Sequence, residues 1–93
     1  MRILELTNYT AGVCGVGARV KQEAALLAQK GHEVQIFSSC FTKGSSDTAS
    51  REDTIGGVRI TRFPARKLGG ESYLSWNFEK EAQVFKPDVM IVH

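Results

Sequence analysis

The sequence predicts an α/β fold, a mostly parallel sheet with helices on its faces. Short apolar segments, nearly continuous rather than alternating, are typical of parallel strands covered on both sides. Between them lie two stretches in which apolar residues recur at helical spacing. The predicted order along the 93 residues is strand, helix, strand, loop, strand, helix, strand. This order favours right-handed βαβ units.

The first predicted unit begins with a strand at residues 3–7, which is apolar except for Glu5. Burying an unpaired carboxylate is costly, so Glu5 must be paired or lie near the exposed end of the strand. We favour a structural ion pair over a catalytic role. A helix follows with one apolar face, Val16, Val20, Ala24 and Leu27.

The first helix is predicted to end at Lys30-Gly31, since a cation suits its last turn and glycine accepts the left-handed conformation beyond it. A second strand then covers residues 34–38. Residues 40–53 are rich in Ser, Thr, Gly and Asp and predict a loop. Gly56-Gly57 predicts a tight turn into a third strand at residues 58–63.

A second helix is predicted after Gly69-Gly70, because four apolar residues share one helical face: Leu74, Phe78, Ala82 and Phe85. Ser72 or Ser75 could cap its start, Trp76 would be one of its packing residues, and Pro87 would end it. The apolar residues 89–92 predict the last strand.

Composition predicts one soluble domain or part of one, with 42% apolar residues, 24% charged residues and a net charge of +2. The chain shows neither a signal peptide nor a membrane span, which predicts a cytoplasmic location and leaves peripheral membrane contact open. Cys14 and Cys40 lack the spacing of a disulfide framework or a zinc site, so we expect free thiols and no metal.

Basic residues gather in one segment: Arg59, Arg62, Arg66 and Lys67. They could attract an anionic ligand or lipid headgroup, although a solvated basic edge is the favoured interpretation. No nucleic-acid-binding signature accompanies them, so we expect no nucleic acid partner.

The glycine-rich segment TAGVCGVGARV, residues 10–20, lies between the first strand and the first helix. In a doubly wound sheet this position borders the ligand site, where Gly12, Gly15 and Gly17 would let backbone N–H groups approach a phosphate or sugar. A simple strand-to-helix turn explains the glycines equally well. The segment is neither G-x-G-x-x-G nor a Walker loop, which disfavours NAD and Walker-type nucleotide sites.

Two histidines and one cysteine are candidate functional residues. His93 follows the last strand, at the edge where ligands bind, and is either a cleft residue or only a satisfied polar end. His32 precedes the second strand and fits a structural role better. Cys14 at a helix start could be a reactive thiol, but a small filler residue is favoured.

The whole chain resembles the first part of the N-terminal domain of GT-B glycosyltransferases, particularly the large retaining family 4. MRILELTNYT resembles the opening strand of that family, and CGVGARVKQEAALLAQKGHEVQIFS resembles its glycine pair, helix and second strand. TIGGVRITRFP and FKPDVMIVH resemble two later segments. Cys14 stands where the first glycine of the pair is usual, and Ile91 replaces a frequent histidine.

The resemblance implies a Rossmann-like fold and transfer of a hexosyl group from a nucleotide-sugar, in carbohydrate biosynthesis and without a metal or other cofactor. The donor loop would be Gly12, Cys14, Gly15, Val16 and Gly17, with His93 near the cleft. No catalytic residue is assigned. The acceptor would be a sugar or a lipid-linked sugar, and membrane association at the cytoplasmic face stays open.

Residues 1–93 are therefore expected to be a partial N-terminal, acceptor-side domain that lacks the C-terminal donor-binding domain and is inactive alone. A different class of function stays open beside this one. The chain could be a stand-alone Rossmann-like binding or assembly module without catalysis, which would associate with itself through an exposed sheet edge.

Overall fold

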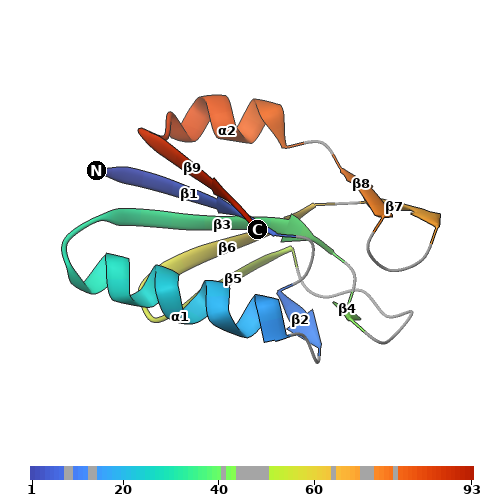
Figure 1. Ribbon diagram of the computed structural model, residues 1–93. Helices are drawn as coiled ribbons and strands as arrows, with labels where there is room; N and C mark the ends of the chain where they lie inside the picture. Colours follow the sequence, from blue (N-terminus) through green and yellow to red (C-terminus); the bar gives the residue numbers. More distant parts are fainter. Residues whose placement is uncertain are drawn as a thin grey trace.

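A five-stranded sheet forms the centre of the computed structural model, with the strand order β5-β6-β3-β1-β9 (Figure 1). The structure describes residues 1–7, 10–12, 15–40, 42–43, 51–63, 65–69, 73–76 and 78–93. Four strands run parallel, and β5 pairs antiparallel with β6. Their bounds are β1 Arg2–Leu6, β3 Glu33–Ser39, β5 Glu52–Ile55, β6 Val58–Phe63 and β9 Val89–Val92. The predicted α/β class is thus confirmed, with a mixed, mostly parallel sheet.

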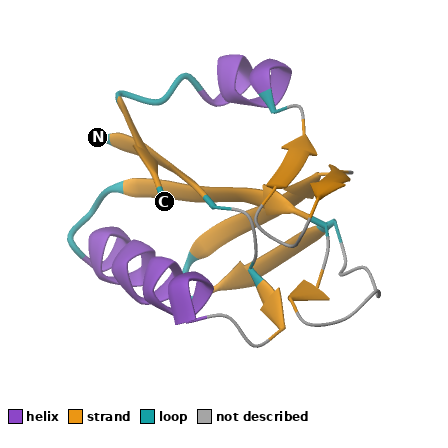
Figure 2. Cartoon of the chain, turned by 45° about the vertical axis from the view of Figure 1, so that its right-hand side comes forward, coloured by secondary structure: helices purple, strands orange, loops and turns teal. Residues whose placement is uncertain are grey.

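The two helices, α1 (Gly15–Gln29) and α2 (Glu79–Phe85), lie on opposite faces of this sheet (Figures 1 and 2). Two further strand pairs lie outside it: β2 (Ala11–Gly12) with β4 (Thr42–Lys43), and β7 (Ala65–Gly69) with β8 (Tyr73–Trp76). Among the described residues, no helix has the length and apolar character needed to cross a membrane.

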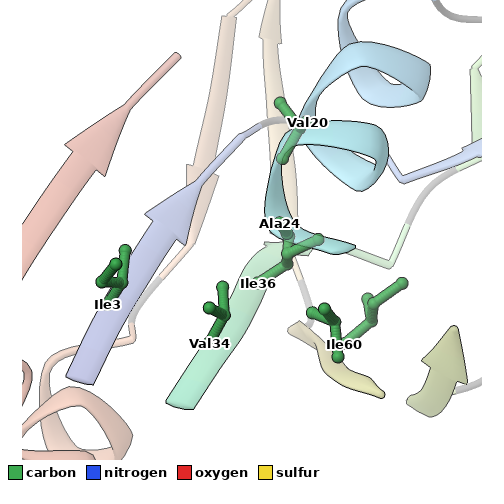
Figure 3. Close-up of a cluster of buried hydrophobic side chains, with 7 residues drawn as sticks. Ile3, Val20, Ala24, Val34, Ile36 and Ile60 are labelled. Atoms are coloured by element: carbon green, nitrogen blue, oxygen red, sulfur yellow. The ribbon is translucent and has the colours of Figure 1, made fainter. Parts of the chain in front are cut away.

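The alternation of side chains along each strand builds one apolar cluster on each face. Under α1, aliphatic residues from the strands meet the buried face of the helix (Figure 3); they are Ile3, Val20, Ala24, Val34, Ile36, Val58 and Ile60. On the other face the cluster is Leu4, Leu6, Phe37, Phe63 and Phe85, the last from α2. In the described part of the chain, the long helix α1 therefore covers one face of the sheet and the short helix α2 covers the other.

The end of α1 confirms the predicted role of Gly31. This glycine has φ +94°, and its N–H donates to the carbonyl of Ala28 at 3.1 Å. The N–H of His32 donates to Leu27 at 3.2 Å, so the last carbonyls of the helix are satisfied as the chain turns into β3. His32 thus lies at the amino end of β3, where a structural role was expected.

The predicted second helix begins too early. The structure places Tyr73–Trp76 in strand β8, so Trp76 belongs to a β-hairpin and not to a helix, and α2 starts only at Glu79. Its N-cap is Phe78, without a side-chain capping bond. Of the two predicted serine caps, Ser75 lies in β8, and Ser72 lies outside the described residues. The cause is physical: Tyr and Trp favour extended backbone, and pairing with β7 satisfies it.

The predicted loop at residues 40–53 is partly wrong as well. It contains β4 and the start of β5, which pairs with β6 through the Gly56-Gly57 turn. Both glycines have positive φ, +58° and +80°, as the predicted tight turn requires. A Cβ at Gly56 would lie 3.2 Å from that of Ala25, so the turn packs closely on α1.

Candidate functional site

One edge of the sheet gathers the carboxyl ends of the four parallel strands. In open α/β sheets ligands bind beyond this edge, at the point where successive crossovers leave in opposite directions. Here the chain moves from β1 to β3 and β6 on one side and then returns to place β9 on the other side of β1. The switch point therefore lies between β1 and β9.

A row of polar residues follows the aliphatic cluster on the α1 face at this edge. Ser38 lies opposite Arg62 in the β3–β6 register. Extending the registers of β1 by one position places Thr7 beside Ser38 and beside His93. The bonds from Thr7 N to Phe37 O at 3.1 Å and from His93 N to Leu6 O at 2.9 Å agree with this alignment. Polar groups thus line the edge where a ligand would arrive.

Glu5 and His93 form the closest polar side-chain pair across the switch point. Oε1 of Glu5 lies 2.9 Å from Nε2 of His93. The Glu5 side chain is 0% exposed, whereas that of His93 is 21% exposed. The structure confirms that Glu5 is paired, and it gives His93 a polar partner while one part of the imidazole still faces solvent.

Burial raises the pKa of Glu5 above its ordinary value, because the charged carboxylate loses its hydration. The hydrogen bond from His93 acts in the opposite direction, the negative charge of Glu23 raises this pKa further, and the charge of His93 lowers it. Overall, the pKa of Glu5 is raised, so this carboxyl group takes up a proton more readily than a solvated glutamate does.

Glu23 approaches the same pair from α1. It directly precedes Ala24, a buried residue of the helix face, so its exposed side chain stands at the rim of that face. One ligand atom each from Glu5, Glu23 and His93 lie within 4.8 Å of one another. The pair can hold or pass a proton, and the three side chains together can hold a cation. Sequence reasoning missed Glu23, for which no spacing signal exists.

Arg62 occupies the same row, two strands away from Glu5. Its side chain is 5% exposed; Nε donates to Thr10 Oγ1 at 2.8 Å, and Nη2 lies 3.7 Å from Asp53 Oδ2. The hydroxyls of Thr10 and Ser38 are also 2.8 Å apart. This buried network fixes the residue that opens the glycine-rich segment against the ends of β3 and β6.

The predicted basic edge is divided by strand alternation. Arg59, on the opposite face from Arg62, is exposed and pairs with Glu52 at 3.5 Å. The side chains of Arg66 and Lys67 lie outside the described residues. Among the described arginines of this segment, one is thus buried and one is exposed, and both have carboxylate partners.

The predicted donor loop lies at the same edge, because α1 begins there (Figure 1). Gly12 is in β2, while Gly15, Val16 and Gly17 form the first turn of α1, where Gly17 is buried. Cys14 falls outside the described residues, and Cys40 is a free thiol. The described loop residues and His93 therefore share one edge of the fold, and their contact with a ligand stays a prediction.

Comparisons with protein-family models, with curated proteins and with solved structures found no match to this chain. The family resemblance of the sequence thus rests on its motifs alone.

Proposed function

We propose that the chain is the acceptor-side, N-terminal part of a retaining GT-B glycosyltransferase, with a Rossmann-like fold, that transfers a sugar from a nucleotide-sugar. The single observation that carries this is the Glu5–His93 pair, 2.9 Å apart at the switch point between β1 and β9. Ligands of open α/β sheets bind at this point. The motif resemblance supplies the class of reaction, which the site geometry alone leaves open.

His93 would orient the acceptor. When the Glu5 carboxylate is ionised and the imidazole is neutral, Nε2–H donates to Oε1 and leaves the lone pair on Nδ1. Nδ1 can then accept a hydrogen bond from a hydroxyl of a sugar acceptor. Glu5 is a positioning residue in this scheme, because its buried carboxylate fixes the ring without touching substrate.

The first turn of α1 would face the donor. The positive end of the helix dipole at the start of α1 favours a diphosphate, which supports the expectation that sugar transfer needs no metal. Gly12 and Cys14 would complete this wall. The departing nucleotide also needs the donor-binding domain, so we expect no transfer by residues 1–93 alone.

The test uses the complete polypeptide that contains this chain. We expect it to release nucleoside diphosphate from one of a panel of UDP-, GDP- and ADP-sugars in the presence of sugar or lipid-linked acceptors. His93→Gln should lower kcat/KM at least tenfold, whereas His32→Gln, at the opposite edge of the sheet, serves as the matched control. Absence of turnover together with unmoved amide signals of residues 12–17 at saturating donor would overturn the proposal.

One observation favours a second candidate, an assembly module. β9 is an outer strand of the described sheet, and its side chains Val89, Met90 and Val92 are exposed. An apolar edge strand is a template for pairing with another chain. Sedimentation should then show concentration-dependent association that Val92→Lys abolishes, and a monomer over the whole concentration range would exclude this candidate.

A further inference from the structure

Two carboxylates converge on one imidazole beside the switch point. Glu5 comes from β1, Glu23 from α1 and His93 from the end of β9, and one ligand atom of each lies within 4.8 Å of the others. The negative charge of Glu23 acts unfavourably on the Glu5 carboxylate. A single imidazole therefore faces two acidic groups, one of them fully buried.

The second oxygen of Glu5 strengthens this observation. Oε1 contacts His93, whereas Oε2 is buried and has no hydrogen-bond partner among the described residues. A buried carboxylate oxygen without a partner is costly, and nearly all such oxygens in proteins are hydrogen-bonded or bound to a cation. A cation held by both oxygens of Glu5 would give Oε2 the partner that it lacks among the described residues.

We propose that Glu5, Glu23 and His93 form a binding site for a divalent transition-metal cation of the Zn²⁺ class. One imidazole nitrogen and two carboxylate oxygens are a zinc donor set, and the fourth position is left to water. The imidazole disfavours Mg²⁺ and Ca²⁺, which take oxygen ligands. The site shares Glu5 and His93 with the proposed acceptor contact, and an ion on Nε2 would replace the Nε2–H bond to Glu5. It is therefore a metal-bound state of the pair, separate from the metal-free sugar transfer.

The distances suit such an ion after a small adjustment. Zinc ligands lie about 2.0–2.2 Å from the ion, so neighbouring ligand atoms are about 3 Å apart. Oε1 of Glu5 and Nε2 of His93 are already 2.9 Å apart. Glu23 is exposed on the helix and can change rotamer to close the remaining gap. The bound cation would link β1, α1 and β9.

The primary test is titration of the metal-free complete polypeptide with Zn²⁺, followed by calorimetry and by thermal unfolding, without any sugar donor. Cys14→Ser and Cys40→Ser form the background, because thiols bind zinc. We expect one Zn²⁺ to bind per chain and to raise the midpoint temperature of unfolding. EDTA should bring this midpoint back to the metal-free value. Glu23→Gln should weaken binding at least tenfold, whereas Glu33→Gln, exposed at the opposite edge, should bind as the background does.

A second readout locates the ion without the cysteine replacements. In the wild-type chain, Zn²⁺ should shift the imidazole ¹⁵N signals of His93 and leave those of His32 unchanged. Absence of binding up to millimolar Zn²⁺, equal binding by the Glu23→Gln variant, or shifts at His32 instead of His93 would each overturn the site. Because no donor is present, this failure is distinguishable from a failure of the proposed function.

Discussion

The two faces of the sheet carry different kinds of side chain at the carboxyl ends of the parallel strands. Under the 15-residue α1, aliphatic packing gives way at this edge to Glu5, Arg62 and His93. On the face of the seven-residue α2, aromatic packing continues to the edge, where the rings of Phe37 and Phe63 meet edge-to-face at 5.0 Å. Alternation along each strand therefore puts the buried charged residues on the α1 face, whereas the buried polar residues of the other face, Ser39 and Thr61, are uncharged.

The cover of the two faces differs as well. The α2 face carries an open cavity of about 210 Å³ between the sheet and the helix, lined in part by Phe37, Val84 and Phe85. On the α1 face, Ile36 and Ile60 are fully enclosed. Among the described residues, the buried charged side chains, Glu5 and Arg62, both lie on the α1 face, where hydrogen bonds hold them in fixed positions.

The largest expected effect tests this difference in cover. Ile36→Ala should lower the free energy of unfolding by about 2–5 kcal/mol, since α1 cannot collapse fully onto the lost volume. Val84→Ala on α2, where the side chain is 78% exposed, should change it by less than about 0.5 kcal/mol. Urea unfolding followed by circular dichroism measures both losses, and equal losses would contradict the difference in burial between these two positions.

A smaller difference in stability is expected between alanine replacements of the two arginines of β6. Arg62→Ala should lower the free energy of unfolding by about 1–3 kcal/mol, because it removes the donor to buried Thr10 and the partner of half-exposed Asp53. Arg59→Ala should cost less than about 1 kcal/mol, since its pair with Glu52 is exposed. Chemical unfolding of the two variants gives the loss in free energy of unfolding for each. A larger loss for Arg59→Ala would contradict the assignment of Arg62 to the buried face and Arg59 to the exposed one.

The smallest expected effect concerns pH and Glu5. Because burial raises its folded-state pKa, the stabilisation linked to this pKa shift is fully present below the ordinary value and is lost as the pH rises through the raised one. Glu5→Gln removes that loss and keeps an acceptor for His93, so this variant should be more stable than the wild type at neutral pH.

The measurement is urea unfolding of both proteins from pH 3 to pH 8 with EDTA present, so that no cation neutralises Glu5. The advantage of the Glu5→Gln variant should vanish in acid, where the wild-type carboxyl group is also neutral. A difference in stability that stays constant across this pH range would argue against the raised pKa.

The helices and strands were predictable where their buried faces require apolar residues at regular spacing in the sequence. The strands β1, β3, β6 and β9 and the helix α1 agree with the predicted segments to within one or two residues. The exposed strand β5, Glu52–Ile55, gives no apolar signal and is defined only by its partner β6. The spacing from Leu74 to Phe85 fits a helical face, but pairing of β8 with β7 prevails over it, which the sequence spacing does not reveal.

The candidate site was only partly predictable for a similar reason. The position of His93 after an apolar strand places it at the ligand edge, and the charge of Glu5 within a strand demands a partner. That these two residues meet depends on the strand order. Glu23 is one polar residue among several on α1, and only the packing of that helix brings it to the pair.

The pairing of β9 with β1 also has a consequence for folding. Glu5 and His93 are separated by 88 positions, so their contact closes a long loop. Loop-closure entropy makes such contacts late and slow compared with the local β5–β6 hairpin. The imidazole signal of His93 should therefore report the final docking step during refolding, after the hairpin signals have already reached their native values.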